Sequence, residues 1–172
     1  PKNLSYPLLA DGAWGTELMN RKRAAGTAAE AFNLDSPEIV ASLATDYIHS
    51  GADIILTNSF QGARFQLERH GLADRVYEIN QRAAEISVRA RDEVNHANED
   101  RYRRVLVAGS IGPSGKLILS GDVTPDELES AFRDQAKGLA AGGVDWILIE
   151  SMADLEEMLT AVKGARSVTD LP

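Results

Sequence analysis

Polar residues and glycines follow four short apolar runs of this sequence, and they are the residues best placed to do chemistry. In chain order they are Asp11 with Gly12 and Ala13, Asn58 with Ser59, Ser110 within a glycine-rich stretch, and Glu150. Two carboxylates brought together, Asp11 and Glu150, would suit an ammonium group, and backbone N–H groups of the turn at 12–15 are available to a carboxylate. We therefore expect the function of the protein to depend on these four groups of residues.

The four apolar runs are typical of short strands buried on both faces. They lie at 8–10, 54–57, 105–108 and 146–149. In parallel α/β sheets and barrels, the carboxyl ends of the strands lie on one face, where the functional site is built. We therefore expect the polar residues after the four runs to converge. The stretch 109–115 is expected to be a glycine-rich turn that lets the backbone approach a ligand closely.

Segments with helical periodicity separate these runs. Ser36 and Pro37 predict a helix start, as N-cap and first helical residue, for a helix that ends at residue 51. Thr124 and Glu127 match a capping box that opens a helix ending near residue 142. Further helices are predicted at 65–70, at about 73–95 and after a capping Asp154. Four consecutive βα units predict an α/β fold, the N-terminal (βα)4 half of an eightfold barrel.

A doubly wound open sheet has the same local alternation, so periodicity alone does not choose between the two architectures. A dinucleotide site in such a sheet would require Gly-x-Gly-x-x-Gly after the first strand, and the turn at 12–15 lacks it. The phosphate-binding P-loop pattern also fails. Five residues separate Gly109 from Gly115 where that pattern has four, and Leu117 follows Lys116 where it requires Ser or Thr.

Composition limits the classes of function. The chain has 172 residues, 44% of them apolar, which suits one domain or a piece of a larger one. Its net charge of −8, from 26 acidic and 18 basic residues, argues against a nucleic-acid partner. No apolar run approaches the length of a membrane span, and the N-terminus lacks the pattern of a signal peptide. We therefore expect a soluble cytoplasmic protein that does not associate with membranes.

The sequence contains no cysteine, which excludes disulfides and thiolate metal sites within this chain. The histidines, His49, His70 and His96, lie far apart without metal-ligand spacing, so we expect no metal to be bound by these residues. The chain opens with Pro1 rather than methionine, and we expect further residues upstream.

Five motifs, in order along nearly the whole chain, resemble the homocysteine S-methyltransferase family. They are DGAWGTEL at 11–18, NLDSPE at 33–38, TNSF at 57–60, GSIGP at 109–113 and ESM at 150–152. Within the family, the stretch 57–72, with Gly62, Arg64, His70 and Gly71, looks closest to the homocysteine domain of cobalamin-dependent methionine synthase and related corrinoid-linked methyltransferases. Any one motif would be a weak signal, but five in family order are specific.

The resemblance implies a (βα)8 barrel that binds homocysteine at the strand carboxyl ends, with zinc held by three cysteine thiolates. Zinc would ionise the homocysteine thiol for attack on an activated methyl group, because the thiolate is the nucleophilic form. It also implies methylcobalamin as methyl donor and a corrinoid protein or domain as partner. The family's cysteines lie in the second half of the barrel, and this chain has none. We therefore expect residues 1–172 to be the N-terminal half of a truncated barrel, inactive in isolation and without catalytic residues of its own.

The resemblance assigns the amino group of the substrate to Asp11 and Glu150. The other substrate-binding candidates are Gly12, Ala13, Asn58, Ser59 and Ser110. Structural interpretations stay open, with Asp11 and Ser110 as turn formers and Asn58 and Ser59 as partners of strand-end backbone groups. Glu150 is harder to explain structurally, because an unpaired charge at the end of an apolar strand is costly to bury.

Two classes of function therefore remain open. The first is the homocysteine-binding portion of a methyltransferase that produces methionine. The second is a non-catalytic half-barrel that binds a small amino acid or assembles with a partner half. In either case, a half-barrel leaves strand edges and apolar surface uncovered, so we expect a homo-oligomer or another assembly.

Overall fold

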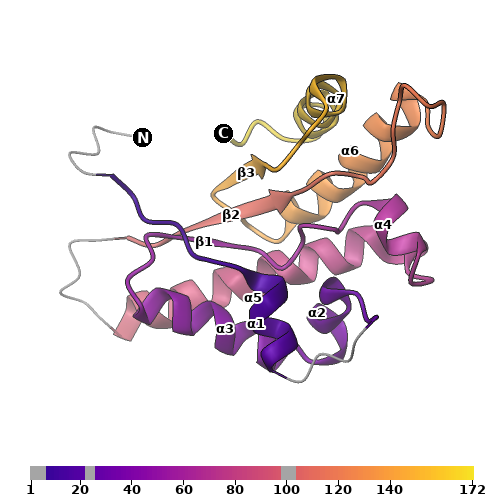
Figure 1. Cartoon of the computed structure of the whole chain (residues 1–172). Coiled ribbons are helices and arrows are strands. Elements are labelled where there is room, and N and C mark those ends of the chain that lie inside the picture. Colours follow the sequence, from indigo (N-terminus) through magenta and orange to yellow (C-terminus); the bar gives the residue numbers. More distant parts are fainter. Residues whose placement is uncertain (1–6, 22–25, 98–103) are drawn as a thin grey trace.

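A parallel sheet forms the centre of the protein. The computed structural model describes residues 7–21, 26–97 and 104–172. The strands are β1 (Ile54–Leu56), β2 (Leu106–Ile111) and β3 (Trp146–Ile149), in the spatial order β1-β2-β3 (Figure 1). The register pairs Ile55 with Val107 and Gly109 with Ile147. The described strands thus follow one another in the sheet in chain order, without reversal.

Helices alternate with these strands. The longer ones are α3 (Pro37–His49), α5 (Val76–Ala97), α6 (Pro125–Ala141) and α7 (Leu155–Arg166). The shorter ones are α1 (Trp14–Asn20), α2 (Phe32–Asp35) and α4 (Arg64–Glu68), with 3-10 turns η1 (Ala29–Ala31) and η2 (Ala73–Arg75). None of the described helices is both long enough and apolar enough to cross a membrane.

Two of the three expected helix caps are confirmed. The Thr124 hydroxyl accepts the Glu127 N–H over 3.3 Å, and the Glu127 carboxylate accepts the Thr124 N–H over 2.9 Å, which completes the capping box of α6. Asp154 caps α7 by accepting the backbone N–H three residues later. At α3, Pro37 lies in the first turn as expected, but the side chain of Ser36 makes no capping hydrogen bond.

The apolar run at 8–10 lies beside β1 but forms only an isolated parallel bridge, between Ala10 and Ile54. The N–H of Asp53 donates to the carbonyl of Leu9, and the N–H of Leu9 donates to the Asp53 carboxylate, both over 2.7 Å. A carboxylate oxygen of Asp53 thus takes the place of a backbone carbonyl as acceptor for the Leu9 N–H in the pairing of the two segments. The expected regular first strand is therefore wrong, although the segment keeps its place at the edge of the sheet.

β2 is longer at its carboxyl end than the apolar run suggested. Gly109, Ser110 and Ile111 belong to the strand, so the expected turn does not begin at Gly109. A Cβ atom on Gly109 would lie 3.2 Å from the side chains of Leu139 on α6 and Ile147 on β3. The glycine at this position therefore allows close packing of α6 and β3, which sequence periodicity does not reveal.

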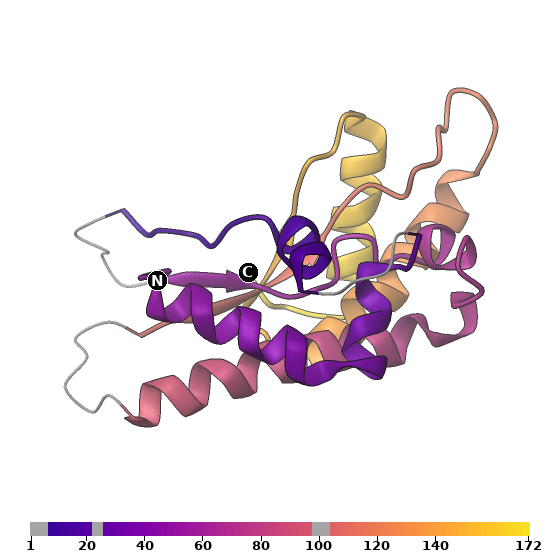
Figure 2. The same ribbon diagram turned by 60° about the horizontal axis from the view of Figure 1, so that its bottom comes forward.

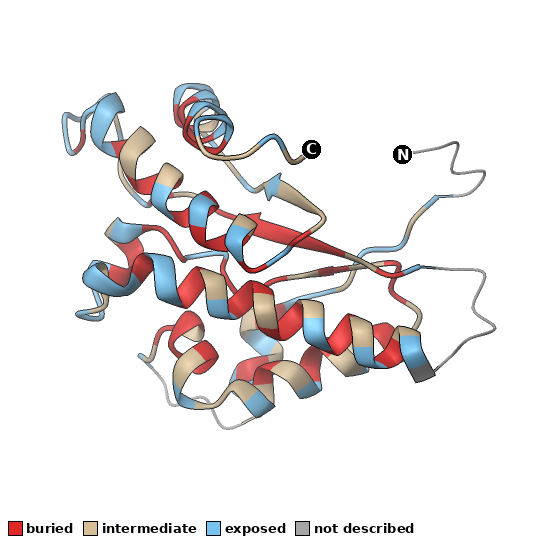
Figure 3. Cartoon of the chain, turned by 180° about the vertical axis from the view of Figure 1, so that it is seen from behind, coloured by how far each residue is buried: buried red, intermediate tan, exposed pale blue. Residues whose placement is uncertain are grey.

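The longer helices pack against one another in chain order, α3 with α5, α5 with α6 and α6 with α7. Figures 1 and 2 show α3 beside α5, and Figure 3 shows α5 and α6 on the same side of the sheet. β2 is buried at every position but its first (Figure 3). The core between sheet and helices includes the fully buried side chains Leu43, Ile48, Ile55, Leu128, Phe132 and Leu139.

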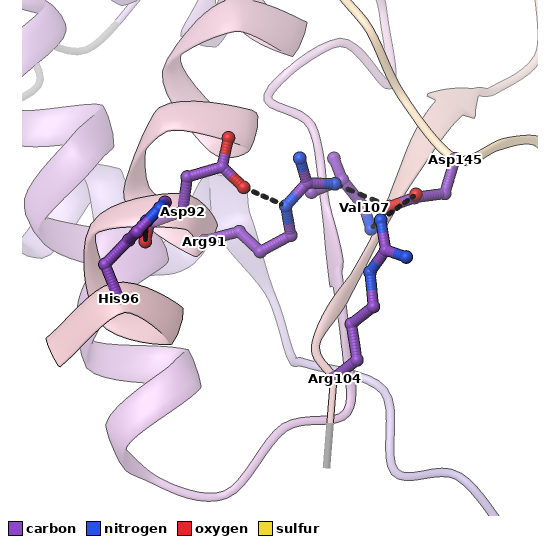
Figure 4. Close-up of polar contacts among 6 residues, drawn as sticks. All are labelled: Arg91, Asp92, His96, Arg104, Val107 and Asp145. Atoms are coloured by element: carbon purple, nitrogen blue, oxygen red, sulfur yellow. Dashed lines mark hydrogen bonds and ion pairs between the residues drawn. The ribbon is translucent and has the colours of Figure 1, made fainter. Parts of the chain in front are cut away.

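An ion pair joins α5 to the amino end of β3. Nη1 of Arg91 donates to Oδ2 of Asp145 over 2.8 Å, and the same oxygen accepts the N–H of Val107 over 2.8 Å (Figure 4). The Arg91 side chain is only 9% exposed. In α/β folds of this kind the site lies at the opposite, carboxyl end of the strands. We therefore assign this pair to stability.

The outer edge of β3 and the adjoining face of α7 carry exposed apolar side chains. They are Leu148 on β3 and Leu155, Leu159 and Val162 on α7, and we call this surface the β3–α7 face. A cavity of about 300 Å³ lies between β3 and α7. The N–H of Ile147 at this edge donates to the carbonyl of Pro172 over 2.9 Å. The edge is therefore partly paired by the chain's own last described residue.

Candidate functional site

A cavity of about 440 Å³ lies at the carboxyl ends of the strands. Its walls come from the segment before α1, the η1 turn, the segments after β1 and β3, and the end of β2. The lining residues are Gly12, Ala13, Trp14, Gly15, Ala29, Glu30, Leu56, Thr57, Asn58, Ser59, Phe60, Gln61, Ser110, Glu150 and Ser151. All of the substrate-binding candidates except Asp11 line this one cavity.

Asp11 lies directly before the lining segment and is fixed by β1. Its Oδ2 accepts the Leu56 N–H over 2.7 Å and the indole N–H of Trp14 over 2.8 Å. Its Oδ1 is buried and makes no hydrogen bond to the described residues. Burial raises the pKa of Asp11, and the nearby negative charge of Glu150 raises it further, against the lowering effect of the two donors. The two carboxylates are thus close enough to interact.

Glu150 continues directly from β3 and receives a hydrogen bond from Ser110. The Ser110 hydroxyl donates to Oε1 of Glu150 over 2.6 Å, and the N–H of Glu150 donates to the carbonyl of Ile111 over 3.0 Å. The next residue, Ser151, has a φ of 58°, a left-handed conformation that residues other than glycine seldom adopt. Such conformations concentrate at functional sites, where the surrounding structure enforces them.

The side chain of Asn58 is engaged within the protein. Its Nδ2 donates to the carbonyl of Ala29 over 2.7 Å and to Oδ1 of Asn33 over 3.0 Å, and the Asn33 amide donates back to the Asn58 carbonyl over 2.9 Å. Ser59 is fully buried, and its hydroxyl donates to the carbonyl of Ser110 over 2.7 Å. Both residues therefore shape the cavity wall, and both have the structural partners that the sequence left open.

Sequence reasoning did not identify Glu30, Thr57 or Gln61 as part of the site. Glu30 is 2% exposed, and its Oε1 accepts the N–H of Gln61 over 2.9 Å. Glu30 stands in a stretch of small residues without periodicity, so no sequence signal singled it out. Thr57 opens the TNSF motif, but its hydroxyl gains a role only through its contacts with Ser59 and with the N–H of Ser110 in β2. With Glu30 and Glu150 in its wall and no Lys, Arg or His among the described lining residues, the cavity favours a cation.

The described residues offer no site for the zinc that the resemblance implies. No group of three or more His, Cys, Asp or Glu side chains in this part of the chain is arranged to hold a metal ion. The full sequence has no cysteine, so a three-thiolate site has no ligand here. The described residues therefore do not fit the metal.

Comparison with known proteins gives a consistent result. The chain is 31% identical over 165 residues to Methionine synthase of Mycobacterium tuberculosis (strain ATCC 25618 / H37Rv), which covers 92% of this chain and 14% of that protein. It is 29% identical over 175 residues to Homocysteine S-methyltransferase YbgG of Bacillus subtilis (strain 168), which covers 92% of this chain and 55% of that protein. The chain thus spans only part of the length of these relatives.

Solved structures support the fold. The metallated form of the Homocysteine Methyltransferase MmuM from Escherichia coli matches with a TM-score of 0.80 at 22% identity, covering 93% of this chain and 59% of that one. The oxidized form matches with the same TM-score at 23% identity. A model of the family described as Homocysteine S-methyltransferase matches residues 8–172. By this match over nearly its whole length, the chain belongs to the homocysteine S-methyltransferase family.

Proposed function

We propose that this chain binds the amino-acid end of homocysteine, as the recognition portion of an S-methyltransferase that converts homocysteine to methionine. The observation that carries the proposal is the cavity at the strand carboxyl ends, lined by Glu150 and adjoined by Asp11. The family's activity on homocysteine makes this amino acid the first ligand to test.

Asp11 and Glu150 are assigned to the ammonium group of the substrate. Burial and mutual repulsion raise the pKa of Asp11, so a cation placed near both carboxylates would relieve a cost that the free protein carries. Ser110 orients Glu150 by donating to one of its oxygens over 2.6 Å. A charge-assisted contact of this kind fixes direction as well as affinity.

The carboxylate of the substrate is assigned to backbone N–H groups of the segment 12–15. Gly12, Ala13, Trp14 and Gly15 line the cavity, and Ala13 stands at the N-cap position of α1 without a capping side chain. The first N–H groups of a helix have no partner within the helix. They therefore suit an anion that enters a cavity whose described lining residues include no Lys, Arg or His.

We further propose that this chain is the N-terminal half of a (βα)8 barrel. The sequential order of the parallel strands supports this, as does coverage of 59% of MmuM. Three cysteine thiolates for zinc, and methylcobalamin on a corrinoid partner, would then be contributed from outside these 172 residues. The residues described here bind and orient the amino acid, and they take no part in activating its sulfur.

Titration calorimetry with homocysteine tests this function. We expect Glu150→Gln to weaken binding by about 1.5 to 3 kcal/mol, the usual contribution of a hydrogen bond to a charged group. The matched control is Glu129→Gln, because Glu129 pairs with Lys163 on the helical surface over 2.6 Å and does not line the cavity. Equal affinities of the parent and Glu150→Gln would remove Glu150 from the site.

A non-catalytic role remains the second candidate, because the chain has no cysteine to hold zinc. A protein that only binds an amino acid would take homocysteine, methionine and other amino acids of that size with similar affinity. The recognition portion of a methyltransferase, supplied with the missing half, would gain one zinc per complex, and with methylcobalamin added as methyl donor it would convert homocysteine to methionine. Metal analysis and methionine detection on the reconstituted pair separate the two functions.

A further inference from the structure

A closed ring of hydrogen bonds joins two side chains to the main chain of Ser110. The N–H of Ser110 donates to Oγ1 of Thr57 over 3.1 Å, and the hydroxyls of Thr57 and Ser59 are 2.6 Å apart. The hydroxyl of Ser59 donates to the carbonyl of Ser110 over 2.7 Å. The exposed fractions of Thr57, Ser59 and Ser110 are 2%, 0% and 1%, so water does not compete with these contacts.

The number of protons fixes the direction of this ring. Each hydroxyl has a single proton to donate, and a carbonyl can only accept. The proton of Ser59 is used at the Ser110 carbonyl, so Thr57 must donate to Ser59. The oxygen of Thr57 in turn accepts the Ser110 N–H. The hydroxyl proton of Ser110 takes no part in the ring, and it is the one donated to Glu150.

The ring is anchored to the helical layer through Ser59. Gln135 on α6 is fully buried, and its Nε2 donates to the carbonyl of Ser59 over 2.7 Å. The same carbonyl accepts the N–H of Gly62 over 2.8 Å. The position of Ser59, and with it the plane of the Ser110 peptide, is therefore set by contacts outside the cavity.

We propose that Thr57 and Ser59 are positioning residues that hold the Ser110 hydroxyl against Glu150, and thereby favour ligands with a protonated amino group. The proposal rests on the proposed function, since it takes Glu150 as the partner of the substrate's ammonium group. The ring holds the N–H and the carbonyl of Ser110, and so fixes the main chain from which its hydroxyl reaches Glu150. A hydroxyl that donates to a carboxylate forms a short, strong bond. Loss of one member should therefore affect the orientation of Glu150 more than the volume of the cavity.

The test compares homocysteine with 4-mercaptobutanoate, which has the same chain, thiol and carboxylate but no amino group. We expect Thr57→Val, which removes the hydroxyl at nearly constant volume, to weaken homocysteine binding about tenfold. Binding of 4-mercaptobutanoate should change by less than about twofold, because it makes no contact through an ammonium group. Thr57→Ser keeps the hydroxyl and should restore the selectivity of the parent.

The matched control is Thr160→Val. Thr160 is also buried, but its hydroxyl donates to the Glu156 carbonyl over 2.8 Å within α7, and it does not line the cavity. This variant should leave both affinities unchanged. If Thr57→Val weakens the binding of homocysteine and of 4-mercaptobutanoate equally, the proposal is overturned, because that result indicates a general structural role for Thr57.

A second variant and a ligand-free measurement keep the proposal testable. Ser110→Ala removes the hydroxyl that donates to Glu150 but keeps the N–H and the carbonyl of residue 110 in the ring. It should therefore produce the same selective loss of homocysteine binding, and it provides the test if Thr57→Val does not fold. A parent protein that binds both ligands equally contradicts the proposed function but not the ring. Crystal structures then decide, since a Ser110 hydroxyl that stays within about 3 Å of Glu150 in Thr57→Val would overturn the positioning role.

Discussion

Asp53 and Asp145 occupy equivalent positions at the starts of β1 and β3, and each exchanges two hydrogen bonds with one residue of the neighbouring segment. The N–H of Asp53 donates to the carbonyl of Leu9, and its carboxylate accepts the Leu9 N–H, both over 2.7 Å. Asp145 forms the same two bonds with Val107, both over 2.8 Å. In both places a carboxylate aligns a strand with the segment that precedes it in the sheet.

The two junctions share the sequence pattern Gly-x-Asp-x-Ile, as GADII at 51–55 and GVDWI at 143–147. Gly51 and Gly143 have φ values of 106° and 87°, which favour glycine and reverse the chain after α3 and α6. The sheet register set at these amino ends also determines which residues emerge together at the carboxyl ends. The repeated junction therefore contributes to the geometry of the distant cavity.

Asp145→Ala should lower the free energy of unfolding by about 2 to 3 kcal/mol. It removes an acceptor from Val107 and one of the two carboxylate partners of Arg91, whose side chain is 9% exposed and keeps only its pair with Asp92. The expected loss lies below the roughly 3 to 5 kcal/mol typical of a broken buried ion pair, because the Asp145 side chain is 22% exposed and Arg91 keeps its pair with Asp92. Urea denaturation measures it. Glu78→Ala, which breaks an exposed pair with Arg75, should have little effect, and equal losses would contradict this assignment.

Gly62→Ala should destabilise the protein by about 2 to 3 kcal/mol. A Cβ atom there would lie 2.4 Å from Oδ1 of Asn80 and 2.8 Å from the carbonyl of Ser59, and the latter cannot move without disturbing the cavity wall. Gly15→Ala is the control, because nothing lies within 4 Å of its Cβ position and α1 should gain from alanine. Thermal unfolding of both variants tests the difference, and similar melting temperatures would show that the wall can relax.

The sequence predicted the order of the elements and the convergence of the strand ends, because the apolar runs and the polar residues after them are local signals. It identified six of the fifteen lining residues, including Ser110 and Glu150, from residues that follow those runs. It did not reveal that Ser110 lies within β2, because a strand that contains glycine is stabilised by pairing with β3, which is a non-local contact.

The same limit explains the missed residues. Glu30 acquires a role through the N–H of Gln61, and Thr57 through the N–H of Ser110, and neither contact has a signature in the local sequence. The run at 8–10 failed as a regular strand for a related reason. The carboxylate of Asp53 takes a bond that periodicity assigns to a backbone carbonyl.

The stability of the protein should depend on the protonation of Asp11. Burial, followed by the charge of Glu150, raises the pKa of this carboxyl in the folded state. A raised folded pKa means that the contribution of Asp11 to stability is fully present below its unfolded pKa and is lost as pH rises through the folded value. The amide that replaces the carboxyl in the Asp11→Asn variant does not titrate. As pH rises from the unfolded to the folded pKa of Asp11, the parent should therefore lose stability relative to this variant. Urea denaturation at several pH values measures the difference, and a constant difference would contradict the raised pKa.

The β3–α7 face should mediate association of the protein. Leu155, Leu159 and Val162 fall at positions i, i+4 and i+7 of α7, with exposed fractions of 66%, 56% and 40%, and Leu148 on the adjoining strand is 37% exposed. Apolar side chains grouped in this way on one face are usually covered by another protein surface. We therefore expect a dimer or larger assembly of the parent in light scattering.

Leu159→Glu should shift the assembly toward the monomer, because it places a charge in the centre of that apolar face. Leu117→Glu is the matched control, since Leu117 is 60% exposed but lies in the segment after β2, outside the β3–α7 face. Association that weakens equally in both variants would indicate nonspecific contacts. A parent protein that remains a stable monomer and unfolds cooperatively would contradict the role of this face. That result would show that the exposed leucines are tolerated in water without association.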